Sequence, residues 1–289
     1  MKGIKLKIAD IIIEVYSEST NLVFPEDEAY KRFVVESGEP NLFLKTHYGE
    51  IPEFELGREI FNSGGVWKLF SNGTNFIFTL TTPPGAQKPY SVAVVDKDFS
   101  RGEIYLSPSN SSSPYALNPL AYPLDEVLMV SILSRGNGIL LHSNCIEDKG
   151  SGMLFTGTSG AGKSTMAQIW QGRNGVKVLT DERVIIRKEN NSFYAYGTPW
   201  HGTAKIHSPD RAVLNKIFFI THGKENSAML LSKVDAASRL IVRAFPTYWD
   251  SAGMEYTLDF ASKIVGNIPC YELPFKPDES IINFVRGIE

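Results

Sequence analysis

Residues 157–164 read GTSGAGKS, and this stretch decides the interpretation of the second half of the chain. It matches the phosphate-binding pattern G-x-x-x-x-G-K-[ST] at every fixed position. Phosphoryl oxygens need many hydrogen-bond donors in a small volume, and glycines let a backbone curl so that its N–H groups point inward. Apolar residues 153–156 precede the stretch and residues 165–171 have helical character. The sequence therefore predicts a strand, a phosphate loop and a helix.

The residues of this loop have expected roles toward a nucleoside triphosphate. Lys163 is expected to reach the β- and γ-phosphates, and the Ser164 hydroxyl is expected to bind Mg²⁺. The positive N-terminal end of the following helix would face the phosphates. The expected cofactors are ATP and Mg²⁺. The expected nucleotide-binding residues are Gly157, Thr158, Ser159, Gly160, Ala161, Gly162, Lys163, Ser164 and Thr165.

Two adjacent carboxylates follow the next predicted strand, residues 176–180. Asp181 and Glu182 would lie at its carboxyl end, where ligand-facing groups gather in open α/β sheets. One carboxylate would hold Mg²⁺ and the other would orient and deprotonate an acceptor hydroxyl; the alternative is a solvated acidic turn. Residues 183–188 and 192–196 predict an antiparallel hairpin, unlike the central parallel strand of motor and transporter ATPases.

His142, the glycine-rich loop and the acidic pair together resemble the catalytic core of HPr kinase/phosphorylase. That family has a His in a strand before a GxSGxGKS loop and two acidic residues after the next helix. The resemblance is close over residues 138–190, and ATP-dependent phosphoenolpyruvate carboxykinase is a more distant relative. The resemblance to HPr kinase/phosphorylase implies an α/β nucleotide-binding domain with a mixed sheet that phosphorylates a protein serine. The implied catalytic residues are Asp181 as acid/base, Lys163 and His142, and the implied metal ligands are Ser164, Glu182 and Asp181.

The sequence also departs from that family. Glu182 stands where the family has Asp, and residues 197–203 (GTPWHGT) replace its Glu-x-Arg-Gly stretch. The first 115 residues do not resemble that enzyme's N-terminal domain. The chain is therefore predicted to be an HPr-kinase-like relative, some of which accompany peptide-maturation clusters, and not HPr kinase itself.

Residues 1–115 are predicted to form a β-rich N-terminal domain, and residues 116–289 the kinase-like domain. Hairpins are expected around residues 71–74 and 98–102, and a short helix is expected over residues 26–36. The stretch SNSSSPYALNP at 109–119 is the expected boundary. The exposed strand edges of the first domain would dock an extended peptide, or the domain would serve as a contact in a homo-oligomer.

Composition excludes several classes of protein. The 289 residues carry a net charge of −3, without the basic surplus of a nucleic-acid binder. No stretch approaches the length of a membrane span, and two cysteines cannot form a disulfide framework. A cytoplasmic protein without nucleic-acid or membrane partners is expected.

Three alternatives remain open from the sequence. A GTPase is favoured by residues 232–235 (SKVD) and 250–253 (DSAG), although their order is the reverse of the GTPase order. A nucleotide-binding regulator or scaffold without phosphotransfer is favoured by the altered metal region. The third alternative is a kinase of a small metabolite. The sequence does not identify the acceptor.

Overall fold

The computed structural model describes residues 3–18, 22, 28–82, 88–110 and 117–288. The chain divides into two units, residues 1–132 and residues 133–289. The predicted boundary between residues 115 and 116 lies outside the described residues.

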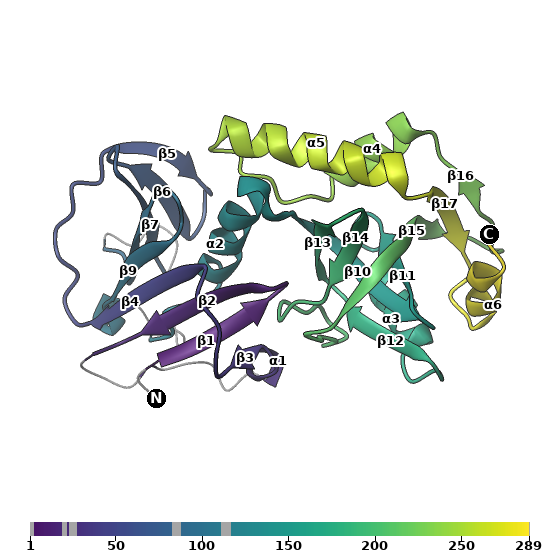
Figure 1. Cartoon of the computed structure of the whole chain (residues 1–289), viewed down its shortest axis with the longest axis horizontal. Helices are drawn as coiled ribbons and strands as arrows, with labels where there is room; N and C mark the ends of the chain where they lie inside the picture. The colour runs from purple at the N-terminus through teal and green to yellow at the C-terminus, as the bar shows by residue number, and fades with distance from the viewer. Residues whose placement is uncertain (1–2, 19–21, 23–27, 83–87, 111–116, 289) are drawn as a thin grey trace. The chain divides into compact units, whose positions relative to one another are not determined.

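The first unit is built on a nine-stranded mixed sheet with the order β3-β1-β2-β4-β9-β8-β7-β6-β5 (Figure 1). The β2–β4 and β4–β9 pairs are parallel and the other pairs are antiparallel. The elements are β1 (Gly3–Ile8), β2 (Ile11–Tyr16), α1 (Glu28–Lys31), β3 (Val34–Val35), β4 (Leu42–Tyr48), β5 (Arg58–Asn62), β6 (Trp67–Ser71), β7 (Asn75–Leu80), β8 (Ser91–Asp96), β9 (Arg101–Leu106), η1 (Pro108–Asn110) and α2 (Leu124–Ile132).

Turn residues set the hairpins of this sheet. Gly73 has φ +92° between β6 and β7, in the left-handed region that glycine adopts without strain. The expected hairpin of β8 and β9 is also present. A helix over residues 26–36 was expected, but α1 ends at Lys31 and Val34–Val35 pair with β1 as β3 instead. Residues 26 and 27 of that expected helix lie outside the described part of the chain.

The second unit contains an eight-stranded mixed sheet and four α-helices among its described residues. Together with the first unit, it confirms the expected α/β class with mixed sheets. The elements are η2 (Leu133–Asn137), β10 (Ile139–Asp148), β11 (Ser151–Thr156), α3 (Lys163–Trp170), β12 (Val176–Thr180), β13 (Arg183–Glu189), β14 (Ser192–Tyr196), β15 (Arg211–His222), β16 (Met229–Leu230), α4 (Lys233–Ile241), α5 (Ser251–Asn267), β17 (Cys270–Phe275) and α6 (Ser280–Arg286).

Two long strands, β10 and β15, each pair along different parts of their length with different neighbours. The first half of β10 pairs with β13, and its second half pairs with β11 and β12. In the same way β15 pairs first with β14 and then with β11 and β17, in parallel with both of the latter. β11 is parallel to β15, and β11 and β12 are both antiparallel to β10. The carboxyl ends of β11, β12 and β15 therefore point to the same edge of the sheet, where the loop after β11 begins.

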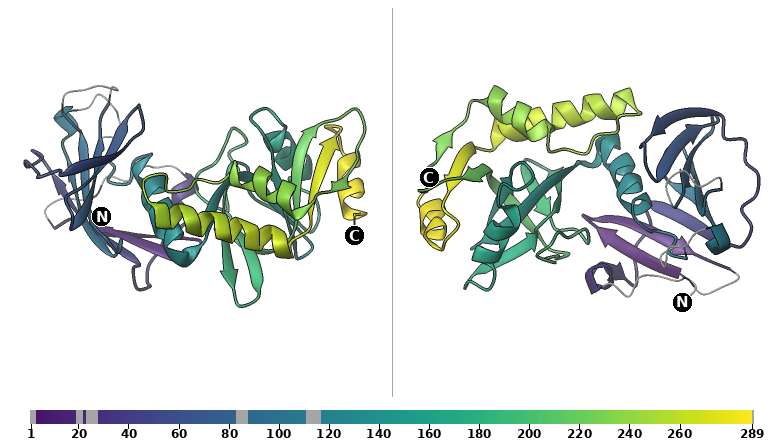
Figure 2. Two further views of the ribbon diagram at one scale, coloured as in Figure 1. Left: turned by 90° about the horizontal axis from the view of Figure 1, so that it is seen from above. Right: turned by 180° about the vertical axis from the view of Figure 1, so that it is seen from behind.

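Helices cover both faces of this sheet (Figures 1 and 2). Alternate residues of β11 explain why, since Leu154 belongs to a core with α4 and α5, whereas Met153 and Phe155 belong to a core with α3 and α6. A sheet buried on both faces requires apolar side chains at successive strand positions. The run predicted from residues 153–156 satisfies this requirement.

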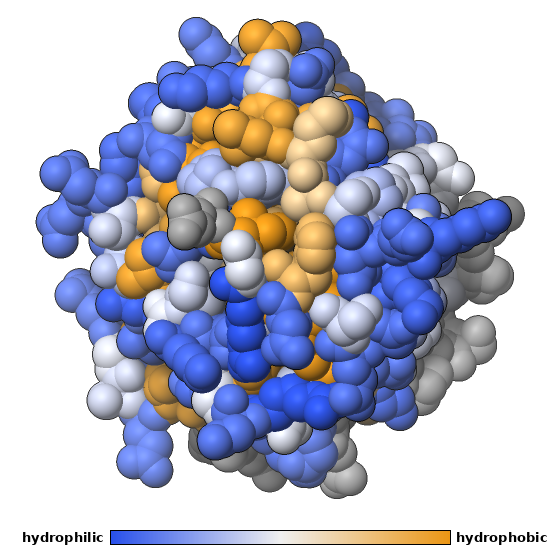
Figure 3. Space-filling view, turned by 90° about the vertical axis from the view of Figure 1, so that its right-hand side faces the viewer, coloured by the Kyte–Doolittle hydropathy of each residue, from blue (hydrophilic) through white to orange (hydrophobic). Residues whose placement is uncertain are grey.

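Figure 3 views the molecule from the side of β16 and β17, and apolar side chains gather in the upper half of that view. The exposed apolar side chains of this region are Met229, Leu230 and Val234. No helix among the described residues has the length and apolar character that crossing a bilayer would need.

The two GTPase-like patterns cap helices. Ser232 caps α4 by accepting a hydrogen bond from the backbone N–H of Asp235, and Asp250 caps α5 by accepting one from the N–H of Ala252. Polar residues at these positions satisfy orphan backbone donors of helices. Helix capping accounts for both patterns without a bound guanine.

Candidate functional site

Residues 157–164, here called the glycine loop, connect β11 to α3. Gly160 and Gly162 have φ of +78° and +98°, a region that side chains disfavour. A Cβ on Gly157 would lie 2.8 Å from the carbonyl oxygen of Ile220, and one on Gly162 would lie 2.8 Å from the ring of Phe275. Both glycines are therefore required by the close approach of neighbouring strands.

Two side chains from neighbouring strands hold the glycine loop. The Nε2 atom of His222, at the end of β15, lies 2.7 Å from the carbonyl oxygen of Gly160. The Nδ2 atom of Asn144, in β10, donates to the carbonyl oxygen of Lys163 at 2.7 Å. Both contacts use main-chain oxygens of the loop, and the N–H of Ala161 donates to the carbonyl oxygen of Thr158 at 3.1 Å within the loop.

Lys163 begins α3 with its side chain almost completely buried. Its Nζ atom donates to two carbonyl oxygens of its own loop, at 3.2 and 3.3 Å. Burial is the largest cause that lowers the pKa of Lys163; the carboxylate of Glu182 opposes this shift, and the cations of Arg243 and Arg183 add to it. Three cationic side chains and one carboxylate therefore act on each other at this loop.

Asp181 does not face this group of charges. Its carboxylate is fully buried and accepts hydrogen bonds from the backbone N–H groups of Gly202 at 2.9 Å, Ala204 at 2.8 Å and Ile206 at 3.3 Å. The carboxylate thus fixes residues 202–206 against the end of β12. Its role as acid/base or metal ligand, which the resemblance implies, stays a prediction. In the structure three backbone N–H groups use most of the acceptor positions of this carboxylate.

Glu182, the next residue, does reach the charged group. Its Oε1 atom lies 3.2 Å from Nε2 of His142 and 2.6 Å from a guanidinium nitrogen of Arg183. The hydrogen bond with His142 is the largest cause that lowers the pKa of Glu182 to about 2; burial opposes it, and the charges of both partners assist it. The side chains of His142 and Glu182 are about one third exposed, so a substrate can reach the pair.

Backbone pairing places His142 between two segments. Its N–H donates to the carbonyl oxygen of Arg243 at 2.8 Å, and the N–H of Ser143 donates to that of Glu182 at 3.1 Å. The guanidinium of Arg183 lies 4.5 Å from the ring centre of Phe245. β10 therefore collects the His, the acidic residue and both arginines around one point.

Arg239 and Arg243 lie four residues apart, a spacing that places two residues on one face of a helix, yet the structure separates them. Arg239 forms an ion pair with Glu272 of β17 at 2.8 Å. α4 ends at Ile241, and Arg243 lies beyond it beside Lys163. The Nε atom of Arg243 is buried without a hydrogen-bond partner in the described structure. Because the spacing alone does not show where the helix ends, the sequence did not distinguish the two arginines.

Residues 202–206 bring a further hydroxyl to the site. Oγ1 of Thr203 lies 3.5 Å from Oγ of Ser164. A Cβ on Gly202 would lie 2.9 Å from a carboxylate oxygen of Asp181 and 3.0 Å from one of Glu182. Thr203 and Gly202 were not predicted as site residues from the sequence, where the glycine within GTPWHGT was the available signal.

The oxygen groups near the glycine loop fit a magnesium ion that arrives with a nucleotide. Mg²⁺ prefers oxygen ligands and commonly takes only one or two carboxylates, with phosphates and water completing its shell. The Ser164 hydroxyl and the ionised Glu182 carboxylate are of this kind. No cluster of three or more His, Cys, Asp or Glu residues suited to a metal occurs in the part of the chain that the structure describes.

The chain was compared with curated proteins, solved structures and protein families. None of the curated proteins matches the chain. The Hpr(Ser) kinase/phosphatase from Coxiella burnetii matches 51% of this chain and 93% of its own, with 16% sequence identity and a TM-score of 0.29. A likeness of this degree leaves the function to be argued from the chain itself.

The family comparison covers a larger and continuous part of the chain. A profile of the family described as SynChlorMet cassette protein ScmC matches residues 124–276. This range is more than half of the chain, and it contains β10, the glycine loop, the acidic pair and Arg243. The chain belongs to the ScmC family.

Proposed function

We propose that this chain is an ATP-dependent kinase that transfers the γ-phosphate to the hydroxyl of a peptide or protein serine. The observation that supports it is the assembly of Lys163, Arg183 and Arg243 with the His142–Glu182 pair beside the glycine loop. Phosphoryl transfer demands positioning and neutralisation of charge more than covalent chemistry by the protein. This group of residues offers both.

Each residue has a proposed role. The backbone of the glycine loop and Lys163 bind the β- and γ-phosphates, and Arg243 with its buried Nε atom contacts the phosphoryl group that moves. The Ser164 hydroxyl and Glu182 would hold Mg²⁺, which neutralises phosphate charge. Asp181 takes no part in the chemistry and holds residues 202–206 in place.

The proposed step balances as a simple displacement. The serine oxygen forms a bond to the γ-phosphorus, while the bond from that phosphorus to the β–γ bridging oxygen breaks and leaves ADP. The serine proton passes to His142, whose Nε2 atom lies 3.2 Å from Oε1 of Glu182. Because the transition state is loose, a weak base suffices to orient the hydroxyl and accept its proton late.

A second candidate is a nucleotide-binding regulator that performs no phosphotransfer. Two observations favour it: the first acidic residue is locked by three backbone N–H groups, and the pKa of Glu182 is lowered to about 2. A carboxylate with so low a pKa is a poor proton acceptor by itself. The kinase proposal therefore depends on His142.

The test is to incubate the enzyme with γ-labelled ATP, Mg²⁺ and serine-containing peptides, with free serine in parallel. Label on a peptide serine, lost in Lys163→Ala, supports the kinase. Nucleotide binding without transfer to any peptide or metabolite supports the regulator. Label on free serine supports a kinase of small metabolites. Competition between ATP and GTP in the same assay excludes or establishes a guanine preference.

A further inference from the structure

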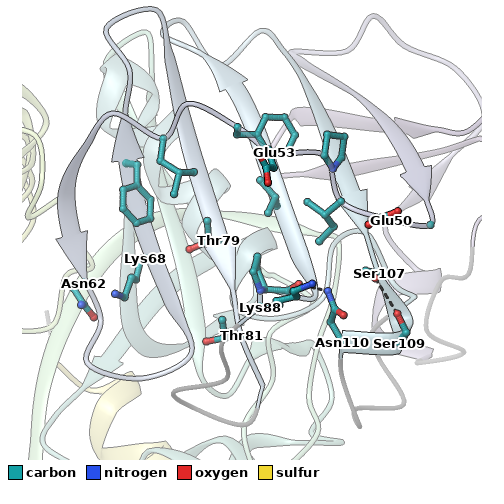
Figure 4. A pocket seen from close by; sticks show the side chains of 18 of the residues that line it. Glu50, Glu53, Asn62, Lys68, Thr79, Thr81, Lys88, Ser107, Ser109 and Asn110 are labelled. Carbon is teal, nitrogen blue, oxygen red and sulfur yellow. Dashed lines mark hydrogen bonds between the residues drawn. The ribbon is translucent and has the colours of Figure 1, made fainter.

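A large channel lies in the first unit, between residues 49–57 and the outer face of β6, β7 and β8 (Figure 4). Its volume is about 1330 Å³, larger than the roughly 300–1,000 Å³ of a small-molecule pocket. Apolar side chains line its interior, among them Phe54 on one wall and Phe70 and Val92 on the other. The size suits a chain segment better than a metabolite.

The sheet face inside the channel follows from strand alternation. Lys68, Thr79 and Val92 are direct neighbours across β6, β7 and β8, and all three line the channel. The adjacent row of neighbours across the same three strands points to the other face of the sheet and is buried there: Leu69, Phe78 and Ala93. Alternate residues of a strand point to opposite faces, so one face forms the core and the other remains available.

Residues 49–57 are held at few points along the opposite wall. The N–H of Gly49 donates to the carbonyl oxygen of Leu106 at 2.9 Å, and the ring of Phe54 lies 5.0 Å from that of Tyr105. At its other end the segment passes close to the backbone of β6, since a Cβ on Gly57 would lie 2.3 Å from the carbonyl oxygen of Ser71. The segment is thus fixed at both ends and at one ring.

Between those points the backbone is unpaired. Within the described structure, no N–H or C=O group of residues 50–56 bonds to another backbone group, and a single side chain, Asn72, reaches the carbonyl oxygen of Glu55 at 3.5 Å. Backbone groups without protein partners must bond to water or to a ligand. An extended peptide offers complementary N–H and C=O groups at the matching strand spacing.

The two walls carry opposite charges. Glu50 and Glu53 are exposed on the 49–57 segment, and Lys68 and Lys88 are exposed on the side of the sheet (Figure 4). Lys68 lies 3.3 Å from Glu59. Among the described residues, Glu50, Glu53 and Lys88 have no ion-pair partner in the protein. The channel therefore offers both an acidic and a basic wall to a ligand.

We propose that this channel binds an extended peptide whose main chain pairs with residues 50–56. An acidic side chain of the peptide meets Lys68 and Lys88, and a basic side chain meets Glu50 and Glu53. Apolar side chains of the peptide contact the partly exposed rings of Phe54 and Phe70. The inference rests on the proposed function only where it identifies this peptide as the one that carries the acceptor serine.

The test begins with a library of randomised peptides selected for binding to the full chain without nucleotide. Enriched peptides are labelled with fluorescein, and their affinity is measured by anisotropy. We expect Thr79→Arg, which fills the channel with a long side chain, and Lys88→Glu, at an exposed position, each to weaken binding at least about tenfold. Lys97→Glu is the matched control, because Lys97 lies in the turn between β8 and β9 and outside the channel. This change should leave the peptide affinity unaltered.

Two measurements separate specific docking from general attraction. Exchanging the acidic residue of the selected peptide for Lys should restore its binding to Lys88→Glu. N-methylation of alternate peptide amides, which removes main-chain donors, should weaken binding to the wild type. No enrichment, equal binding to Thr79→Arg, or a concentration-dependent dimer that Thr79→Arg abolishes would each overturn the proposal, the last by showing that a second copy occupies the channel.

The outcome is independent of the proposed kinase activity. Lys163→Ala should bind the selected peptide with unchanged affinity, because the glycine loop belongs to the other unit. A peptide that binds in the channel but receives no label from ATP leaves the docking inference standing and removes the peptide as acceptor.

Discussion

Nε2 of His142 lies 3.2 Å from Oε1 of Glu182, although β10 and the end of β12 bring them together from positions 40 residues apart in the numbering. The contact makes Glu182 the carboxylate that faces the glycine loop, while Asp181 beside it turns into the protein. Three of the predictions below depend on this division between two adjacent acidic residues.

The first prediction concerns acid stability. The pKa of Glu182 is lowered from 4.5 to about 2 in the folded protein. A lowered carboxylate pKa stabilises the fold above the unfolded value and loses that effect as the pH falls through the folded value. The unfolding free energy of the metal-free wild type minus that of Glu182→Gln should therefore decline between pH 4.5 and about 2. A difference that is constant over this window contradicts the assigned contact.

The second prediction concerns turnover. Glu182→Gln keeps the size of the side chain but cannot share a proton with His142, and losing a general base typically costs about 10²–10⁴-fold in rate. We expect a fall of that order in phosphotransfer, with ATP affinity measured without Mg²⁺ within a few-fold of the wild type. Glu225→Gln, an exposed change between β15 and β16, serves as the control. Normal turnover in Glu182→Gln would show that the pair is not used.

The third prediction concerns Asp181. An amide at this position cannot accept three backbone N–H groups as a carboxylate does, and hydrogen bonds to charged groups contribute about 1.5–3 kcal/mol each. Asp181→Asn should lower the unfolding free energy by roughly 2 kcal/mol or more, as measured by denaturant titration. If stability is unchanged while turnover collapses, Asp181 is the acid/base that the resemblance implied, and its observed contacts are not its working ones.

The fourth prediction concerns nucleotide binding. Lys163→Ala removes a buried cation from the glycine loop, and we expect at least about a tenfold loss of ATP affinity in calorimetric titration. Lys177→Ala, at an exposed position on β12, provides the control. Equal affinity in Lys163→Ala and the wild type would remove the loop as the phosphate site.

The fifth prediction concerns Arg243. Arg243→Gln removes a cation beside Lys163 without removing the backbone pairing that positions His142. We expect turnover to fall by about 10²-fold with a smaller change in ATP affinity, as for a group that acts on the transition state. Arg239→Gln, whose side chain pairs with Glu272, should leave turnover nearly unchanged. Equal effects of the two changes would contradict the assignment.

Local patterns predicted much of this structure. Consecutive residues whose local conformational preferences agree with the final fold form two of the predicted features. These are the strand, loop and helix around GTSGAGKS and the β13–β14 hairpin. The sequence did not predict which of two neighbouring residues faces the site and which is buried. Asp181 and Glu182 are adjacent, and only residues 202–206 decide which of them is buried.

Contacts between distant segments account for what the sequence left out. Arg243 reaches the site because Phe245 and Arg243 bond to β10 on either side of Leu141. The channel under residues 49–57 depends on an irregular segment that no periodic pattern marks. Such features form only when the whole sheet is assembled. The secondary-structure propensities of single segments therefore do not predict them.

The division of β10 between two sets of partners has a consequence for folding. His142 is the last residue that pairs with β13, and Ser143 is the first that pairs with β11. The His142–Glu182 contact depends on the β10–β13 pairing, because His142 is the register partner of Arg183, the residue after Glu182. The position of the glycine loop depends on the β10–β11 pairing instead. Loss of either set by partial opening would dismantle the site, so amide exchange near His142 should follow the slow, global opening of the second unit rather than local fraying.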